Sequence, residues 1–333
     1  MINKFKNNWT NWHHIFHQSI LNNVNFIPNG IHLLISVSGG QDSMALMTLL
    51  DDIKAHHNWS INVWHGNHKW HNKSDEFTKE LQNYCFQKKI IFHKDSADAI
   101  DISTEEKARK WRYQKLFEKA SEICAKNKNQ NNLYIVTGHT SSDNTETFLL
   151  NLARGSNFAG LSGIPSKRLL NKVYFLVRPL MIFSRNDTTA ICKKLKIPFW
   201  VDPTNSDLQL KRNLIRHKII HELEEIYPGC SNRISNFIEK IKNISQERSE
   251  LCELAIKSCS SDDGITRTTL NGLGEQARAT ILYSLLSKKC KKQISSKNIY
   301  DLSKQILKKS SGKKCFSNEV EVIWNKNFLK IIP

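Results

Sequence analysis

The chain has 333 residues and 39% hydrophobic content, which predicts two domains with packed cores. Its 49 basic residues against 31 acidic ones give a net charge of +18, which favours a phosphate-rich partner, with codon drift in an AT-rich genome as the competing explanation. No apolar run is long enough to span a membrane, and the N-terminus has the features of neither a signal nor a transit peptide.

Strand-like and helix-like patterns alternate over the first two thirds of the chain, which predicts a parallel sheet of five strands with helices on both faces. Strands are expected at 31–37, 61–65, 90–93, 133–137 and 173–177. Helices are expected at 42–54, 74–88, 104–126, 143–153 and 185–196. Ligands of such sheets bind at the carboxyl ends of the strands, so polar segments that follow strands are the candidate site.

The segment SGGQDS, Ser38 to Ser43, follows the first strand and opens the first helix. Gly39 and Gly40 permit positive φ and close approach of the backbone, and the helix N-terminus offers free amides and a positive dipole end. The two serines add hydroxyl donors. The loop therefore suits an anion with several oxygens, such as a phosphate chain, although an ordinary glycine-rich connection is the alternative.

Three histidines, His65, His68 and His71, follow the second strand closely. Such a cluster suggests a metal, but the H-x-x-H-x-x-H spacing matches neither helix nor strand periodicity. We therefore favour polar groups that line a cleft at the strand end over a metal site.

Two arginines of the third helix, Arg109 and Arg112, share one helix face, and Trp111 and Tyr113 interleave with them. A solvated charged face and a nucleic-acid contact explain this pattern equally well. A second pair, Arg212 and Arg216, has i,i+4 spacing on the helix that follows residues 202–203. This pair either presents two guanidiniums to phosphate or forms a basic surface helix.

His139 follows the fourth strand, and Asp143 and Glu146 lie on one face at the start of the next helix. The acids either complement the helix N-terminus or act in the site, as Mg²⁺ ligands or as a base. Because the fourth strand and the first end at the same sheet edge, we favour a role in the site. The glycine-rich segment that begins at Arg154 and runs to Ile164 is expected to be a mobile flap or substrate loop.

The character of the sequence changes after Gly229, where a long charged helix pattern at 231–258 begins. Residues 1–229 are expected to form the catalytic domain. Residues 230–333 are expected to form a helical linker and a small C-terminal domain of helix and short strands.

The chain contains eight cysteines, and no two of them form a C-x-x-C pair. This argues against zinc knuckles and cysteine-bound iron–sulfur clusters. With no secretion signal, free thiols in a reducing compartment are the expectation.

These segments resemble the PP-loop enzymes, the N-type ATP pyrophosphatases, whose S-G-G-x-D-S loop corresponds to SGGQDS. The segments ARKWRY, GHTSSDNTET, RGSNFAGLSGI, RPL and DPTN…RNLIR narrow the resemblance to the tRNA(Ile)-lysidine synthase family, over about residues 31–227. The resemblance implies an adenine nucleotide alpha hydrolase-like α/β fold, followed by a smaller, mostly helical C-terminal domain that recognises tRNA.

The activity implied by this resemblance is a ligation that forms a carbon–nitrogen bond. L-lysine would be joined to C2 of the wobble cytidine of tRNA(Ile) with a CAU anticodon, through an adenylylated cytidine, and ATP would give AMP and diphosphate. The product, lysidine, pairs with A, so the tRNA changes from methionine to isoleucine specificity. The lysine ε-amine must lose a proton before it attacks, because the pKa of a free lysine side chain is about 10.4, and a base is therefore required.

The resemblance also implies roles for individual residues. The loop residues would bind ATP: Ser38, Gly39, Gly40, Gln41, Asp42 and Ser43. Asp42 would also bind Mg²⁺. His139 and Asp143 are the candidate bases, and Arg212 would stabilise the adenylylated intermediate. The tRNA contacts would come from four arginines: Arg109, Arg112, Arg154 and Arg216.

The chain departs from the family pattern after the fourth strand. Many members have H-H-x-D-D-Q there, and this chain has Thr140, Ser142 and Asn144 in place of the second histidine, the first acid and the glutamine. Asp143 is the one acid of the pair that remains. The variant is similar to cyanobacterial and plastid members, which indicates a plastid-encoded enzyme of the stroma, with the cytoplasm of an AT-rich bacterium as the alternative.

Two rival functions compete with this one. A tRNA thiolase of the PP-loop class would need cysteine spacings that this chain lacks. A non-catalytic tRNA-binding protein would not need the complete SGGQDS loop.

Overall fold

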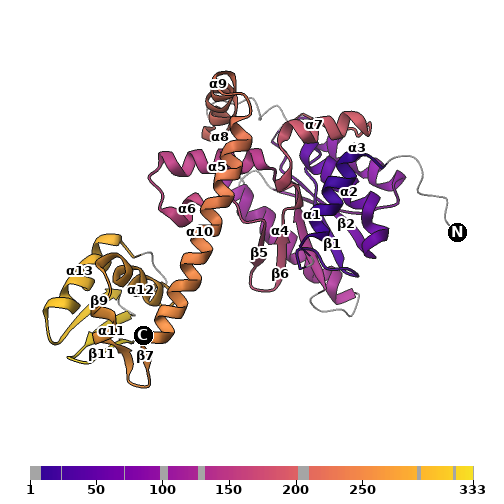
Figure 1. The fold of residues 1–333 in the computed structure, drawn as a ribbon. Coiled ribbons are helices and arrows are strands. Elements are labelled where there is room, and N and C mark those ends of the chain that lie inside the picture. The colour runs from indigo at the N-terminus through magenta and orange to yellow at the C-terminus, as the bar shows by residue number, and fades with distance from the viewer. Residues whose placement is uncertain are drawn as a thin grey trace. The chain divides into compact units, whose positions relative to one another are not determined.

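The computed structural model describes residues 9–23, 25–70, 72–97, 104–126, 132–201, 210–290, 294–317 and 320–332. The chain divides into two compact units, Met1–Ile241 and Lys242–Pro333. Helix α10 (Cys230–Cys259) begins in the first unit and ends in the second (Figure 1). The domain boundary expected at Gly229 thus lies at the start of α10, and the boundary between the two units lies within that helix.

A six-stranded sheet forms the centre of the first unit, in the order β3-β2-β1-β4-β6-β5. Its strands are β1 (His32–Ser36), β2 (Ser60–Asn67), β3 (Ile91–Ser96), β4 (Leu133–Thr137), β5 (Lys167–Leu170) and β6 (Tyr174–Val177). The five predicted strands are all present and pair in parallel, while β5 pairs antiparallel to β6. The prediction missed β5 because its four residues begin with two cations and carry no clear alternation.

Helices cover both faces of this sheet, as the alternating pattern predicts. One face packs against α1 (Asn11–Leu21), α2 (Gln41–His57), α3 (Ser74–Gln87) and α7 (Arg185–Lys194), and the other face packs against α4 (Glu105–Lys126). Helix α1 was not predicted, yet its Phe16 and Ile20 belong to the main core. The next elements along the chain are α5 (Ser141–Ala153), α6 (Phe158–Leu161) and the 3-10 turn η1 (Pro179–Ile182).

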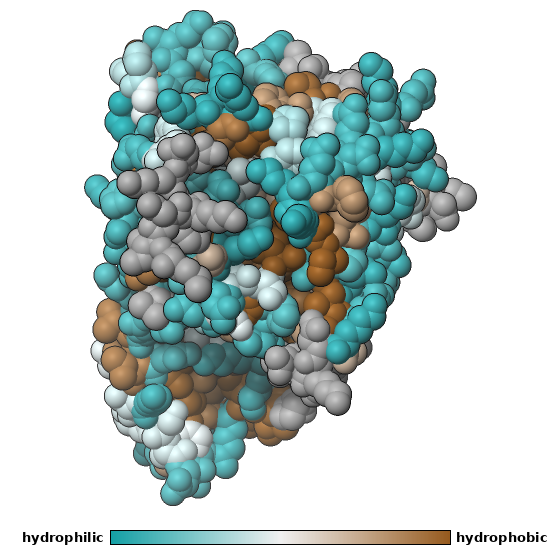
Figure 2. All heavy atoms as spheres, turned by 90° about the vertical axis from the view of Figure 1, so that its right-hand side faces the viewer, coloured by the Kyte–Doolittle hydropathy of each residue, from teal (hydrophilic) through white to brown (hydrophobic). Residues whose placement is uncertain are grey.

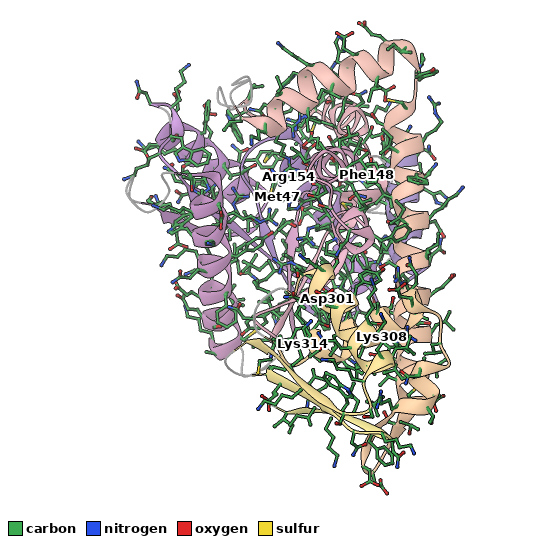
Figure 3. All side chains as sticks on the ribbon, turned by 90° about the vertical axis from the view of Figure 1, so that its left-hand side faces the viewer. Met47, Phe148, Arg154, Asp301, Lys308 and Lys314 are labelled. Atoms are coloured by element: carbon green, nitrogen blue, oxygen red, sulfur yellow. The ribbon has the colours of Figure 1, made fainter. Side chains whose placement is uncertain are left out.

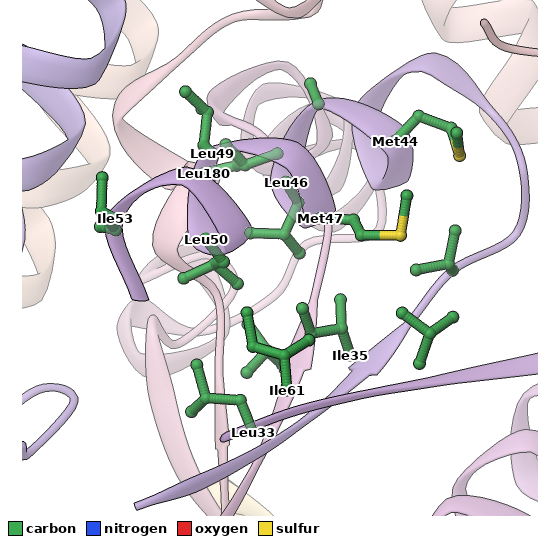
Figure 4. Close-up of a cluster of buried hydrophobic side chains, with 14 of the residues drawn as sticks. Leu33, Ile35, Met44, Leu46, Met47, Leu49, Leu50, Ile53, Ile61 and Leu180 are labelled. Atoms are coloured by element: carbon green, nitrogen blue, oxygen red, sulfur yellow. The ribbon is translucent and has the colours of Figure 1, made fainter. Parts of the chain in front are cut away.

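The core explains why α2 is a rigid support for the loop at its start. Leu33 and Ile35 of β1 point toward α2, and Leu34 points to the opposite face, because side chains alternate along a strand. Figure 4 shows Met44, Met47 and their neighbours on α2 packed over these strand residues. Because α2 is enclosed by the sheet and by other helices, its apolar residues surround most of its circumference.

Three short helical segments of the first unit precede α10: α8 (Lys211–Leu214), the π-helical turn η3 (Ile215–Ile219) and α9 (Ile220–Ile226). The second unit contains α11 (Arg267–Asn271), α12 (Glu275–Ser287) and α13 (Ser296–Lys308). It also contains a five-stranded antiparallel sheet, β7-β8-β11-β10-β9. The strands of that sheet are β7 (Ser260–Ser261), β8 (Gly264–Thr266), β9 (Gly312–Ser317), β10 (Val320–Trp324) and β11 (Phe328–Ile332).

The C-terminal region is mostly helical, as the resemblance implies, and the short strands expected there form one antiparallel sheet that contributes to the core. Leu302 and Ile306 of α13 are buried together with Val322 and Trp324 of β10. Buried and more exposed residues alternate along β10, and its sheet partners, β9 and β11, lie on either side of it in the chain.

The face of the molecule in Figure 2 is mostly hydrophilic, with apolar patches between polar side chains. Among the helices that the structure describes, none combines the length and the apolar character needed to cross a membrane.

Candidate active site

The loop Ser38 to Ser43 forms a tight turn between β1 and α2 that its own serines hold in place. Ser43 Oγ donates to the Gly40 carbonyl at 2.9 Å and accepts the Ser38 amide at 3.2 Å, while Ser38 Oγ accepts the Gly40 amide at 3.3 Å. Gly39 has a φ of +89°, which favours glycine. No side chain caps α2 at its N-cap Gly40, so the first amides of the helix are suited to an anion.

Gly138, which follows β4, brings a second loop against this turn. A Cβ on Gly138 would lie 3.1 Å from the backbone N and Cα atoms of Ser43 and 3.2 Å from the carbonyl carbon of Asp42. Because a side chain there would press on that backbone, glycine lets the two loops pack backbone to backbone. The residues after Gly138 are consequently held beside the loop, as the shared sheet edge predicted.

Asp42 is half-buried at the first turn of α2. Thr188 Oγ1 donates to Asp42 Oδ1, and Arg185 Nη1 lies 3.5 Å from Asp42 Oδ2. Burial raises the pKa of Asp42 above its usual value, against the lowering effect of Arg185, and the nearby carboxylate of Asp143 adds to the increase. The site therefore holds two carboxylates, Asp42 and Asp143, and the charge of Asp42 is not fully compensated by its neighbours. Such a pair of carboxylates suits a divalent cation.

Asp143 and Glu146 form an ion cluster with both predicted arginines of the α8–η3 segment. Glu146, 1% exposed, accepts Arg212 Nε at 2.7 Å and Arg216 Nε at 2.6 Å. Asp143 Oδ1 accepts Arg212 Nη2 at 2.9 Å, and Asp143 Oδ2 accepts the Thr140 amide at 2.8 Å. Burial alone would raise the pKa of Asp143, but Arg212 and the other donors more than offset it, so this pKa lies below its usual value.

His139 lies at the carboxyl end of β4, where its Nδ1 is 3.0 Å from Thr137 Oγ1. Burial lowers the pKa of His139 to about 3, with Arg178, Arg212 and Arg109 also disfavouring its cation, although Asp143 favours it. The imidazole is therefore neutral at neutral pH and retains a lone pair.

The other predicted arginines do not all reach this site. Arg109 stacks over the Tyr113 ring at 5.1 Å, close enough to affect His139, and Arg112 Nη2 lies 3.4 Å from His68 Nε2. Arg154 is exposed at the C-cap of α5, at the opposite end of that helix from Asp143. The length of α5 separates the two by about 15–20 Å.

The histidines at the end of β2 and just after it are structural where the structure describes them. His65 is buried, with Nδ1 2.8 Å from the Val37 carbonyl and Nε2 3.1 Å from Thr78 Oγ1. His68 stacks on Trp70 with ring centroids 5.0 Å apart, and His71 lies outside the described residues. No group of three or more His, Cys, Asp or Glu side chains in the described ranges is arranged to hold a metal ion.

The segment expected to be a flap, Arg154 to Ile164, makes defined hydrogen bonds to α5. Asn151 Nδ2 donates to the Gly160 carbonyl at 2.8 Å, and the Ile164 amide donates to Asn144 Oδ1 at 2.7 Å. Asn144, the residue that replaces the family glutamine, is therefore an anchor of this segment.

Sequence reasoning missed several residues of the site. Arg185 and Thr188 of α7 contact Asp42, and their only signal is a capping box that begins at Ser184. Arg178, directly after β6, is 1% exposed, and its Nη1 donates to the Pro165 carbonyl at 2.5 Å. Trp200 packs on Gly39, a contact with no local signal at all.

The sheet order and the loop define the class of protein. A family model described as "PP-loop domain" matches residues 13–223. The fold is similar to that of U34-tRNA thiolase NcsA from Methanococcus maripaludis, with a TM-score of 0.54, 16% identity and coverage of 69% of this chain and 78% of that chain. The chain therefore belongs to the PP-loop family, and the thiolase likeness concerns the fold alone.

Within this class, the relatives identify a particular group. A tRNA(Ile)-lysidine synthase from Prochlorococcus marinus subsp. pastoris is 51% identical over 99% of this chain and 98% of its own length. One from Prochlorococcus marinus strain SARG is 38% identical over 99% of this chain and 98% of its own length. A chloroplastic one from Pyropia yezoensis is 36% identical over 61% of this chain and 59% of its own. The chain belongs to the tRNA(Ile)-lysidine synthase family.

Proposed function

We propose that the chain uses ATP to join L-lysine to C2 of the wobble cytidine of tRNA(Ile) with a CAU anticodon. The observation that carries this proposal is the backbone packing of Gly138 on Ser43, which holds His139 and Asp143 beside the anion-binding turn. Family membership supplies the reaction, and the geometry supports a place for each of its parts.

The loop would bind the β- and γ-phosphates of ATP, which leave as diphosphate when the C2 oxygen of the cytidine is adenylylated. The uncapped start of α2 supplies amides, and Ser38 and Ser43 hold the turn. Asp42 and Asp143 would hold Mg²⁺, which typically takes one or two protein carboxylates and completes its shell with phosphates and water. Bound there, Mg²⁺ would neutralise charge on the phosphates.

Proton removal from the lysine ε-amine is proposed for His139, with Asp143 as the alternative acceptor. His139 is neutral, whereas the carboxylate of Asp143 is already engaged by Arg212 and the Thr140 amide. An anionic phosphate chain in the loop would raise the pKa of His139 by Coulomb attraction and make it a better acceptor. Arg212, held at Glu146, would face the developing charge of the intermediate.

The thiolase alternative finds no support in the cysteines. Cys85 and Cys192 are buried, which raises the pKa of each to about 12, with the carboxylates of Asp51 and Asp42 as further causes. A thiolate nucleophile needs the opposite shift. All eight cysteines are free thiols.

The tRNA contacts are proposed for Arg109 and Arg112 near the site, for Arg154 on the exposed end of α5, and for residues 230–333. The relatives also bear on the compartment. The relative from Prochlorococcus marinus subsp. pastoris has a higher identity than the chloroplastic one and covers more of this chain. This difference supports the cytoplasm of a cyanobacterium over the plastid stroma.

The test is incubation of the purified protein with ATP, labelled lysine and total tRNA, followed by nucleoside analysis. We expect labelled lysidine, with AMP and diphosphate formed in equal amounts when lysine and tRNA are both present, and with no release of AMP when lysine is left out. A thiolated nucleoside, or no lysine-dependent product, would refute the proposal.

A further inference from the structure

Trp200 packs directly on the glycine of the proposed ATP loop. Its backbone amide donates to the Gly39 carbonyl at 3.0 Å. Its ring atom Cε3 lies 2.9 Å from the point where a Cβ of Gly39 would stand. The indole thus fills the space beside a residue in the left-handed conformation, and the backbone of the same tryptophan fixes the carbonyl of that residue.

The indole is in turn held by α3. Trp200 Nε1 donates to Glu80 Oε2, and the Phe77 ring lies 6.1 Å from the indole at an angle of 33°. Glu80 is exposed, and Trp200 is half-buried. Three segments distant in the sequence therefore meet at this side chain: the loop after β1, helix α3, and the chain beyond α7.

We propose that Trp200 is a positioning residue that holds Gly39 in its left-handed conformation before ATP binds. Glycine has the largest conformational freedom to lose, so an unsupported Gly39 would have to be ordered at the expense of binding energy. The inference rests on the proposed role of Ser38 to Ser43 as the ATP site and adds the element that preorganises it.

The first test compares Trp200→Ala with Trp200→Phe. Alanine keeps the backbone amide and removes the ring, so we expect the KM for ATP to rise by about tenfold while the KM values for lysine and tRNA stay nearly constant. Phenylalanine keeps an aromatic face over Gly39 and should restore most of the ATP affinity. Equal increases in all three KM values, or no rescue by phenylalanine, would overturn the positioning role.

A second pair of variants leaves Trp200 and the loop unchanged. Glu80→Ala removes the acceptor of the indole N–H from the exposed surface of α3, so loss of folding is not expected. We expect a rise of a few fold in the KM for ATP alone. Glu76→Ala, an exposed glutamate one turn earlier on α3, is the matched control and should behave as wild type. Equal behaviour of the two variants would count against the proposal.

A spectroscopic readout addresses Trp200 itself. The chain has 8 tryptophans, so the emission of Trp200→Phe is subtracted from that of wild type. The difference spectrum should already be the blue-shifted emission of a packed indole before ATP is added, because the proposal places the indole on Gly39 in the ATP-free protein. The red-shifted emission of a fully solvated indole would overturn the inference.

Failure of this inference is distinguishable from failure of the ATP site. If Ser43→Ala leaves the KM for ATP unchanged, the loop is not the ATP site and the proposed function itself is wrong. If Ser43→Ala weakens ATP use but Trp200→Ala does not, only the role of Trp200 is wrong.

Discussion

Asp42 and Asp143 place two carboxylates beside the turn that we propose binds phosphate, an arrangement that requires cations to be stable. Arg185 faces Asp42, and Arg212 lies between Asp143 and Glu146. The carboxylates of the ion cluster thus have arginine partners, whereas Asp42 has a single guanidinium at 3.5 Å. This difference favours a cation-binding role for Asp42 and a structural role for Glu146.

We predict that Asp42→Asn abolishes lysidine formation and leaves tRNA binding nearly intact. The substitution keeps the acceptor for Thr188 but removes the charge that a metal-bound phosphate chain requires. Lysidine formation should fall by well over tenfold, equivalent to more than about 1.4 kcal/mol of transition-state stabilisation. The measurements are the turnover rate and filter binding of tRNA; an activity loss of less than tenfold would contradict the metal-ligand role.

We predict that Asp143→Ala is severe and that Ser142→Asp is tolerated. Removal of Asp143 takes away an acceptor of Arg212 and the acceptor of the Thr140 amide, so activity should fall by about a hundredfold or more. Ser142 Oγ accepts the Arg185 amide at 3.0 Å, a bond that an aspartate oxygen can also accept at the start of α5. Single-turnover rates on both variants test this, and near-normal turnover of Asp143→Ala would move the role to Glu146.

At the scale of the elements, the sequence predicted the helices and strands that have a clear apolar pattern of their own. The strand at Leu133–Thr137 has the bounds expected, and α10 differs from the expected 231–258 by one residue at each end. Each of these elements has a continuous run of apolar residues at its own period, so neighbours in the sequence suffice to define it. Short elements such as β5 lack such a run and are stabilised by pairing with a strand that follows in the chain.

The same distinction holds for the candidate site, where sequence reasoning predicted the loops at the sheet edge but not the contacts between distant segments. Loops that follow β1 and β4 were predicted because parallel strands bring their carboxyl ends to one edge. The contacts of Arg185 and Thr188 with Asp42 join residues more than a hundred positions apart, and no periodicity encodes that register. The ion cluster of Glu146 with Arg212 and Arg216 also joins residues that are distant in the sequence. Sequence reasoning therefore expected the two guanidiniums to face phosphate and did not predict their carboxylate partner.

Helix α1 packs against the end of α2 through a group of histidines that sequence reasoning did not use. His57 Nδ1 lies 2.7 Å from Asn29 Oδ1, and the His57 ring stacks on Trp59 at 4.2 Å. His57 Nε2 is buried and has no hydrogen-bond partner among the described residues. Burial, followed by the neighbours His17 and His56, lowers the pKa of His57 to about 4.

We predict that this histidine makes the fold sensitive to mild acid. The folded pKa lies below the unfolded value of 6.5, so the unfolded chain takes up the proton first. The contribution of His57 to stability is therefore complete above pH 6.5 and is lost as the pH falls toward 4. His57→Gln should lower the free energy of unfolding near pH 7, because the stacking on Trp59 is removed. The loss of unfolding free energy between pH 6.5 and pH 4 should be smaller in this variant than in wild type, by about 1 kcal/mol.

Urea unfolding at a series of pH values measures this effect. His221→Gln is the control, because the His221 side chain is 64% exposed in its pair with Glu225. If wild type and His57→Gln lose stability in parallel from pH 7 to pH 4, burial of His57 has no part in the acid response.

At the scale of the whole molecule, the role proposed for the second unit is to solve a recognition problem that the site cannot solve. Elongator tRNA(Met) has the same CAU anticodon as the substrate, so the anticodon base cannot supply the specificity. Basic residues outnumber acidic ones in Lys242–Pro333. Lys308 of α13 and Lys314 of β9 are labelled there in Figure 3, and Lys308 is exposed. Phosphate contacts position an RNA, and contacts to bases or shape specify it.

The structure determines where a truncation that tests this role should end. Ile238 and Ile241 of α10 are buried against Phe148 of α5, and Thr145 Oγ1 lies 3.4 Å from the Ser231 carbonyl. A chain that ends at Gly229 would expose Phe148 and lose roughly 2–3 kcal/mol of stability. A chain that ends at Ile241 keeps these interactions and matches the first compact unit.

We predict that residues 1–241 fold and bind ATP, but bind tRNA weakly and discriminate poorly between tRNA(Ile) and tRNA(Met). The reason is that the lysines of the second unit no longer neutralise phosphates of the tRNA. The slope of log affinity against log salt concentration should therefore also be shallower, by about 0.7–0.9 for each phosphate that is left unneutralised. The measurements are filter binding over a salt series and lysidine formation on both tRNAs, with ATP binding as the control for folding. If the folded truncation retained full affinity and full preference for tRNA(Ile), recognition would have to lie within the first unit, and the arginines near the site, Arg109 and Arg112, would be the next residues to replace.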